Sequence, residues 1–289
     1  MKVVGLGNPI MDEIAFVDED FIQNINGAKG GMELIDLDAL KNLKSNLKDK
    51  THKVAGGSSA NTIFALTKLG IETSFIGKLG ECILGEDYKN QYLHLGGDIS
   101  SLKFEPINTG NCISLVTPDS ERTMRTYLGA ATKLSIDDIS IDDFKSYDLL
   151  HIEGYMLYNI EVLKKSLKIA KSLNMLISLD LASFEIVKLL REEIKEILIE
   201  YVDIVFANED EATTFANLGK SETEKSLDYL SQFCEISVVK LGKKGSILKK
   251  KDLIVRNKSI ETKNCIDTTG AGDFWASGFL YGISKGLHM

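Results

Sequence analysis

Apolar residues are arranged in two different patterns along the chain. From about residue 148, short apolar runs rich in β-branched residues alternate with longer runs in which apolar positions recur at helical spacing. This alternation predicts βαβ units, in which helices cover both faces of a largely parallel sheet. We therefore expect an α/β fold whose body is a doubly wound, mostly parallel sheet. The expected elements are strands at 148–153, 175–180, 202–207 and 236–241 and helices at 159–173, 185–200 and 209–217.

The first part of the chain departs from this rhythm. A strand is expected at 2–7 and an amphipathic helix at 38–48, but the residues at roughly 13–37 and 102–128 are strand-like without a clean helical period. We expect these two segments to leave the main sheet and to pair as a small β-sheet that covers its edge. Such a sheet is either a lid over a site or an ordinary surface hairpin, and the pattern alone favours neither.

Length and charge narrow the class of protein. A chain of 289 residues suits one large α/β domain spanning 1–289 better than two complete domains. The net charge of −8 gives no basic footprint for nucleic acid. No apolar run approaches the roughly 18 residues of a membrane helix, and the N-terminus resembles a strand rather than a signal peptide. We expect a cytoplasmic enzyme with no membrane or nucleic-acid partner.

Cysteine and histidine residues give no sign of a metal cage or a disulfide framework. The four cysteines are widely spaced, with no C-x-x-C pair, and the four histidines are equally scattered. Buried, reduced thiols and structural histidines are the expected outcome. The residues concerned are Cys82, Cys112, Cys234, Cys265, His52, His94, His151 and His288.

Two glycine-containing segments are ambiguous as ligand sites. Gly5-Leu-Gly7-Asn-Pro-Ile10 begins like a dinucleotide fingerprint but has Ile10 in place of the third glycine. Gly56-Gly57-Ser58-Ser59-Ala60-Asn61 opens a helix, where the glycines would let a ligand approach the backbone and Asn61 could bond a sugar hydroxyl. The alternative for the second segment is a glycine-rich turn with Ser58 as helix N-cap.

The third segment, Asp267-Thr-Thr-Gly-Ala-Gly-Asp273, has the composition of an anion hole. Glycines at 270 and 272 let successive backbone N–H groups converge, and the helix that begins there adds about half a positive charge. Asp273 in the first helical turn could accept a proton from an attacking hydroxyl. The alternative is a carboxylate that only complements the helix dipole. The chain has no Walker loop, which excludes a Walker-type NTPase, and it also lacks the protein-kinase signature set. The absence of a nucleophile elbow argues against an α/β-hydrolase.

The second and third segments together resemble the two signatures of the ribokinase-like (PfkB) family of carbohydrate and nucleoside kinases. The resemblance extends over essentially the whole chain and implies that the small β-sheet is a lid over the acceptor. Within the family, three stretches resemble the adenosine kinase branch: Gly7 to Asp12, Val202 to Phe215 and Ser120 to Ala131. The resemblance therefore implies an ATP-dependent kinase with Mg²⁺ as cofactor and favours a nucleoside as acceptor.

The resemblance also implies a role for each matching residue. The catalytic set would consist of Asp273 as base, the amides of Gly270, Ala271 and Gly272 around the phosphoryl group, and Arg122 closing over it. The acceptor would be held by Asn8, Asp12, Gly57 and Asn61. The nucleotide would lie against Asn208, Lys240, Gly242, Gly245 and Thr268, and Glu211 would order water around Mg²⁺.

Several alternatives stay open at this level. A kinase for a free sugar such as fructose or ribose would share every catalytic residue, and apolar residues such as Met11, Tyr155 and Met156 could stack on a base or belong to the core. The chain ends 16 residues after Asp273, where the family normally continues, so a binding homologue without turnover is a second rival. A nicotinamide-dependent dehydrogenase is the third, although Ile10 spoils its fingerprint. Dimers that form through the lid occur in the family, so the resemblance also allows a homodimer of this kind.

Overall fold

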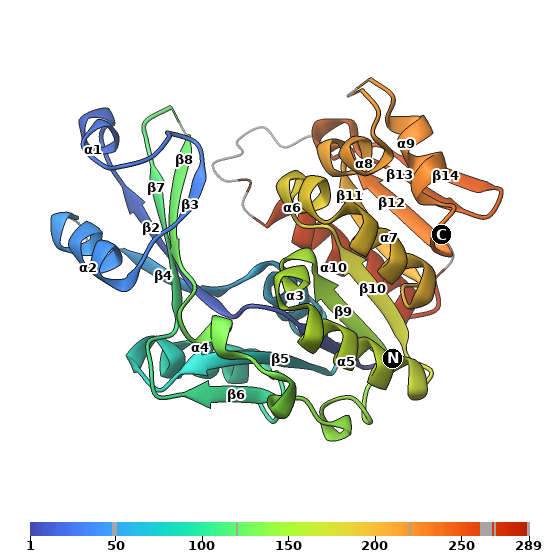
Figure 1. Cartoon of the computed structure of the whole chain (residues 1–289), viewed down its shortest axis with the longest axis horizontal. Coiled ribbons are helices and arrows are strands. Elements are labelled where there is room, and N and C mark those ends of the chain that lie inside the picture. Colours follow the sequence, from blue (N-terminus) through green and yellow to red (C-terminus); the bar gives the residue numbers. More distant parts are fainter. Residues whose placement is uncertain (48–50, 120, 220, 261–267, 269, 288–289) are drawn as a thin grey trace.

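Two β-sheets organise the molecule. The computed structural model describes residues 1–47, 51–119, 121–219, 221–260, 268 and 270–287. The larger sheet has nine strands in the order β14-β13-β12-β11-β10-β9-β1-β5-β6, and the smaller has five in the order β3-β8-β7-β2-β4. Figure 1 shows the small sheet projecting from one side of the helix-covered body.

Seven neighbouring strands of the large sheet run parallel, which confirms the expected fold class. Parallel strands lie between two helical layers, so their sequences are almost continuously apolar, as in Ile-Val-Phe-Ala of β11. The parallel strands are β1 (Val3–Leu6), β5 (Thr73–Gly80), β6 (Leu102–Glu105), β9 (Leu149–Glu153), β10 (Leu176–Asp180), β11 (Ile204–Asn208) and β12 (Ile236–Lys240). The antiparallel strands β13 (Ser246–Lys250) and β14 (Leu253–Asn257) complete one edge.

Each face of the large sheet has its own apolar core. One core packs the sheet against α5 (Ile160–Ser172), α6 (Phe184–Leu189), α7 (Arg191–Glu200), α8 (Glu209–Ala216) and α9 (Thr223–Leu230). The other core packs it against α3 (Ser58–Lys68), α4 (Ile83–Leu95) and α10 (Ala271–Ser284). Short 3₁₀ turns occur at Gly129–Lys133, Ile136–Asp138, Ile141–Asp143, Gly154–Asn159 and Gly242–Lys244.

The single helix expected at 185–200 is two helices. Leu190 adopts φ −120° and ψ 34°, which ends α6, and α7 begins at Arg191. The guanidinium of Arg191 donates a hydrogen bond of 2.7 Å to the carbonyl of Phe215 at the end of α8. Buried Ile186 and Ile194 are eight residues apart, so the apolar period runs through the break and gives no sign of it in the sequence.

Among the described residues, two helices cover the outer face of the small sheet. Ala15, Ile113 and Leu115 pack there against the apolar residues of α1 and α2, and Figure 1 shows both helices on the side away from the body. Its strands are β2 (Ile10–Phe16), β3 (Met32–Leu34), β4 (His52–Gly56), β7 (Gly110–Val116) and β8 (Arg122–Tyr127), with α1 at Glu19–Gln23 and α2 at Leu37–Asn46.

The expected boundaries of the small sheet were wrong at two places. The stretch from residue 102 was expected to begin the small sheet, but β6 pairs in parallel with β5 of the large sheet. Strand β5, helix α4 and strand β6 form one more βαβ unit, and Leu102 is buried in the core of the body. The sequence analysis also missed β4, which pairs with β2 and leads directly into α3.

The cysteines in the described part of the chain are free thiols; Cys112 is buried as expected, but Cys82 and Cys234 are only partly buried. Cys265 and His288 lie outside the described residues. No helix in that part of the chain is both long enough and apolar enough to span a bilayer.

Candidate active site

Asp273 lies where α10 crosses the beginning of α3. Its Oδ2 accepts a hydrogen bond of 2.9 Å from the side-chain amide of Asn61, and its Oδ1 accepts one of 3.3 Å from the Ser58 hydroxyl. The hydroxyl of Thr62 donates to its backbone carbonyl at 3.1 Å. Two of the sequence motifs therefore meet in space. Ser58 is not the N-cap of α3, because Gly57 occupies that position with no side-chain cap.

The environment of Asp273 suits a proton acceptor. Burial raises the pKa of its carboxyl to about 6, with a further upward contribution from the charge of Asp180, whereas the Asn61 hydrogen bond and the Lys240 charge act in the opposite direction. A carboxylate with a pKa close to neutral is ionised at physiological pH and still has some affinity for a proton. This balance is what general-base catalysis requires.

The turn before α10 only partly matches the expected anion hole. Gly270 is the N-cap, with a left-handed φ of 69°, and Ala271 and Gly272 begin the helix. The amide of Ala271 donates to the carbonyl of Thr268 at 3.1 Å, so it is held within the turn rather than presented to an anion. The expectation that all three amides point at one anion therefore needs correction at Ala271. Asp267 and Thr269 lie outside the described residues.

The glycine pair at 56 and 57 lets two segments approach closely. A side chain at Gly56 would collide with the carboxylate of Asp12, and one at Gly57, which has φ 111°, would collide with the carbonyl of Asn8. Glycine avoids both collisions and tolerates the positive φ. The motif thus brings β2 of the small sheet against the start of α3, and with it the predicted acceptor residues Asn8, Asp12 and Asn61.

Asp12 and Arg122 both belong to the inner face of the small sheet, which is the face not covered by α1 and α2. Burial raises the pKa of Asp12 to about 7; the Arg122 charge lowers this pKa and the Asp273 charge raises it. Such mutual influence means that the three charged groups converge from one sheet and one helix. The structure thus assembles the predicted acid, base and arginine into one place.

Glu153 is a site residue that the sequence analysis missed. It ends β9, is only 1% exposed, and accepts hydrogen bonds from the backbone and side chain of Asn8 at 2.9 and 2.7 Å. Its other oxygen accepts from the backbone and hydroxyl of Ser59, both at 2.9 Å. The side-chain amide of Asn8 is therefore used in a hydrogen bond within the fold. The available signal was a carboxylate at the carboxyl end of an otherwise buried strand.

Asn208 and Glu211 form a capping box at the start of α8. Asn208 donates to both carboxylate oxygens of Glu211, at 2.8 and 2.7 Å, and accepts from the Glu211 amide at 2.8 Å. Burial raises the pKa of Glu211 to about 7, the Asp180 charge adds to this rise, and the Lys240 charge opposes it. The carboxylates of Glu211 and Asp180 disfavour each other's ionised form, and a bound cation would reduce this repulsion.

The described residues contain no cluster of three or more His, Cys, Asp or Glu side chains arranged to hold a metal ion. Mg²⁺ beside nucleotide phosphates usually keeps several waters and needs only one or two carboxylates. Buried Glu211, with Asp180 close enough to influence its pKa, fits an ion held mainly by phosphates and water. No fully protein-built metal cage is required.

The other predicted nucleotide residues lie near the same strand ends. Lys240 ends β12 and forms an ion pair of 2.6 Å with Asp180, which ends β10. Gly242 and Gly245 flank the tight turn between β12 and β13, both with positive φ, and a side chain at Gly245 would collide with the carbonyl of Asn257. Gly245 is therefore needed for the hairpin itself. Thr268 is exposed.

Two of the three apolar candidates for base stacking belong to the core. Met11 is fully buried and Met156 is 2% exposed. Tyr155 is only partly buried, and the charges of Glu153 and Asp273 help to raise its pKa to about 12, after the larger effect of burial. Its ring also packs against the apolar core of the body.

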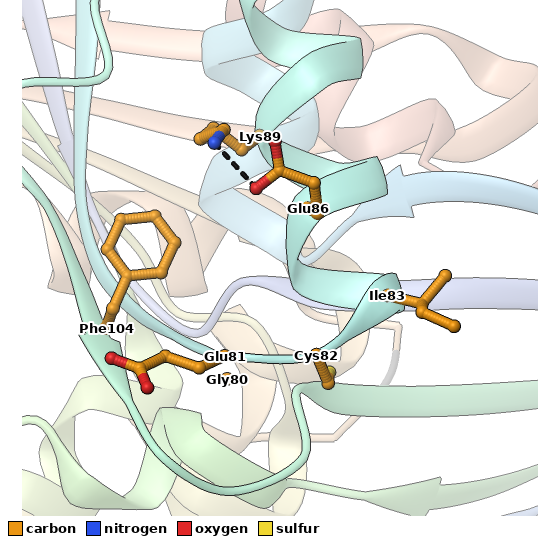
Figure 2. A pocket seen from close by; sticks show the side chains of 7 residues that line it. All are labelled: Gly80, Glu81, Cys82, Ile83, Glu86, Lys89 and Phe104. Carbon is orange, nitrogen blue, oxygen red and sulfur yellow. Dashed lines mark hydrogen bonds and ion pairs between the residues drawn. The ribbon is translucent and has the colours of Figure 1, made fainter.

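A separate hollow of about 540 Å³ lies at the start of α4. Figure 2 shows Phe104 of β6 on one side of it and Glu86, paired with Lys89, on the other. Its remaining lining residues are Gly80, Glu81, Cys82 and Ile83. None of these residues belongs to the constellation around Asp273, so the hollow is not part of the candidate active site.

Several known proteins with related sequences or structures are kinases. The chain is 28% identical over 238 residues to a nucleoside kinase of Methanocaldococcus jannaschii, covering 82% of this chain and 74% of the relative. It is 28% identical over 223 residues to an uncharacterized sugar kinase of Archaeoglobus fulgidus, covering 76% and 86%. The structure of an adenosine kinase from Sinorhizobium meliloti superposes with a TM-score of 0.90 at 29% identity, covering 99% of this chain and 88% of that one.

A family profile also matches the chain to kinases over most of its length. The profile of the pfkB family carbohydrate kinases matches residues 29–289, which include the glycine pair, Asn61 and the helix that carries Asp273. The family resemblance inferred from the two motifs is thereby confirmed. The chain belongs to the pfkB family of carbohydrate kinases.

Proposed function

We propose that the protein transfers the γ-phosphoryl group of ATP to a primary alcohol of a nucleoside, with Asp273 as the general base. The observation that carries this proposal is the position of Asp273. It is held by Asn61 and Ser58 at the N-terminus of α10, opposite Asp12 and Arg122 of the small sheet. Membership of a kinase family supplies the class of reaction.

The reaction follows from these positions. The hydroxyl proton of the acceptor passes to the carboxylate of Asp273 as the alcohol oxygen forms a bond to the γ-phosphorus. The bond between that phosphorus and the β,γ-bridging oxygen breaks, and ADP leaves with the bond's electron pair. Phosphoryl transfer needs mainly positioning and charge stabilisation, which the N-terminus of α10 and Arg122 would supply. Mg²⁺, when bound near Glu211, would neutralise phosphate charge.

The inner face of the small sheet supports a nucleoside rather than a free sugar. On β2, Ile14 lies two residues after Asp12 and on the same face of the sheet. Strand register places Met124 of β8 in the same cross-strand row as Ile14. The other apolar side chains of this face are Phe16, Met32, Leu34, Val54 and Val116, several of them more than 40% exposed. An exposed apolar surface beside a hydroxyl-binding carboxylate suits an acceptor with a sugar and an aromatic base.

We further propose that the small sheet acts as a lid. It supplies Asp12 and Arg122 from a layer separate from Asp273, and its outer face is already covered by α1 and α2. Closing the inner face over an acceptor would bury the apolar side chains and exclude water from the transfer. Water exclusion matters because water is itself a competing acceptor.

The test is ADP release in the presence of ATP and Mg²⁺ with adenosine, inosine, ribose, fructose or no acceptor. Release with adenosine or inosine, but not with either sugar, supports the nucleoside proposal. Release with a free sugar alone keeps the kinase chemistry and selects the second candidate, a sugar kinase, which the relationship to an archaeal sugar kinase favours. Omitting Mg²⁺ should abolish release in either case.

A further inference from the structure

Lys240 is a buried cation at the carboxyl edge of the large sheet. Its side chain is 13% exposed, and its Nζ lies 2.6 Å from Oδ2 of Asp180, which is 5% exposed. Strand β11 separates β12 from β10, so the lysine side chain must cross the end of β11 to reach Asp180. Two strand spacings amount to about 10 Å, which a long lysine and a short aspartate span together.

The ammonium of Lys240 lies against the turn that begins α10. A Cβ atom at Gly272 would be 3.1 Å from Lys240 Nζ, which places the ammonium over the backbone of the first helical turn. The positive end of the helix dipole and the lysine charge therefore act on the same small space. An anion held at this turn would meet both.

The charge on Lys240 is maintained by its surroundings. Burial lowers the pKa of Lys240, but the charges of Asp180, Glu211 and Asp273 outweigh this effect and leave the pKa raised. The same arrangement carries a risk for the catalytic base, because Asp273 is itself within the influence of the lysine. An ammonium free to swing toward Asp273 would pair with it and reduce its basicity.

A buried ion pair is by itself weak evidence of a stabilising role. Apolar residues of similar volume usually stabilise a protein as well as a buried pair does, because desolvation offsets most of the attraction. Other strand positions beside this pair, such as Phe206 and Val238, are apolar and fully buried. The location of the pair beside the turn that begins α10 is therefore its informative feature.

We propose that Asp180 is a positioning residue for phosphoryl transfer, holding the Lys240 ammonium beside Gly272, where the lysine contacts the transferred phosphoryl group. The inference rests on the proposed function, because it places the γ-phosphate of ATP at the start of α10. Asp180 then has two effects. It fixes a positive charge where negative charge develops, and it keeps that positive charge away from Asp273.

The test compares Asp180→Asn with a matched control, Asp143→Asn. The control breaks another buried pair, Lys103 with Asp143 at 2.7 Å and side-chain exposures of 22% and 5%, at the opposite end of the large sheet. We expect Asp180→Asn to lower kcat by about 10- to 100-fold, with the acceptor KM changed less than about threefold. The acid limb of its pH profile should move to lower pH, because the Asp180 charge that raises the pKa of Asp273 is lost and Lys240 would approach Asp273. The control should change neither.

Three results would overturn the inference: a kcat for Asp180→Asn within about twofold of the wild type, an unshifted acid limb, or equal losses in the control. If Asp180→Asn does not fold, Asp180→Glu keeps the ion pair but displaces the ammonium by about one methylene. We then expect kcat to fall at least about fivefold without a large change in unfolding temperature. Wild-type kcat in Asp180→Glu would contradict the proposal.

Nucleotide binding separates failure of this inference from failure of the proposed function. If the wild-type chain turns over no acceptor, the proposed function fails, and titration with Mg·ATP and Mg·ADP still tests Asp180 and Lys240. Lys240→Met and Asp180→Asn should then weaken ATP binding by about tenfold more than ADP binding, whereas Asp143→Asn should not. Equal weakening for the two nucleotides, or none, would reject contact with the γ-phosphate.

Discussion

The side-chain amide of Asn61 donates a hydrogen bond of 2.9 Å to the carboxylate of Asp273, joining two motifs that are 212 residues apart in the sequence. Asn61 was expected to bind only the acceptor. Its Nδ2 holds the proposed base. If the amide carbonyl binds an acceptor hydroxyl, as proposed, Asn61 would link acceptor binding to the ionisation of Asp273.

Replacing Asp273 by Asn should lower kcat by about 10²- to 10⁴-fold, the usual contribution of a general base. The change keeps the size of the side chain, so folding should be little affected, as circular dichroism can check. Glu86→Gln is a suitable control, because it removes an acidic residue from the first turn of another helix, α4. Unchanged turnover in Asp273→Asn would refute the assignment of the base.

The pH dependence of kcat/KM should show an acid limb near pH 6. Protonated Asp273 cannot accept the acceptor's proton, and its pKa is about 6. Asn61→Ala should move this limb to higher pH, because it removes the hydrogen bond that lowers the pKa of Asp273. Thr62→Ala, which alters only a bond to the Asp273 backbone, should leave the limb in place. A limb that stays fixed in Asn61→Ala would contradict the proposed coupling.

Asp12 should make the folded protein less stable as pH rises from about 4 to about 7. Its pKa rises from 3.8 to about 7 on folding, so the folded state binds the proton more tightly than the unfolded state over that range. The cost is fully present above pH 7 and disappears below pH 4. Asp12→Asn removes it, so the variant's unfolding temperature relative to the wild type should be higher at pH 8 than at pH 5. The same difference at both pH values would count against a buried, ionised Asp12.

Glu153→Gln should destabilise the protein by about 2–4 kcal/mol, measured by urea unfolding. Glutamine replaces one acceptor oxygen by an NH₂ group, which would face the donors of Asn8 or Ser59. Ser59→Ala removes only one of the four hydrogen bonds and should cost about 1 kcal/mol. Equal losses in the two variants would show that the carboxylate is not the organising group. The acceptor KM of Glu153→Gln should also rise, because Asn8 and α3 are both displaced.

Met124→Gln tests the apolar inner face of the small sheet. We expect KM for a nucleoside to rise about 10-fold through loss of contact with the base, while kcat changes little because Asp273 is untouched. Ser114→Ala, in the same row of the sheet, provides a control that keeps the apolar character of the face. An unchanged nucleoside KM in Met124→Gln would show that the base binds to another surface.

Much of the body could be predicted from the sequence, because its causes are local. Apolar runs in β9, β10, β11 and β12 and the helical period of the residues between them come from burial on both faces of a parallel sheet. The glycine pair and the Asp267–Asp273 motif likewise show in composition, since a positive φ at Gly57 and Gly270 is a property of single residues. These features gave the fold class, the family and Asp273.

The tertiary structure alone decided how these parts meet. Nothing in the sequence distinguishes Glu153 and Asp180 from other carboxylates, because their contacts depend on the order of the strands. That order places Asp180 two strands from Lys240. It also places Glu153 beside Asn8 and Ser59. The assignment of β6 to the large sheet and the raised pKa values of Asp12 and Asp273 have the same origin. Contacts across many residues and loss of water are collective effects of packing, and no local pattern encodes them.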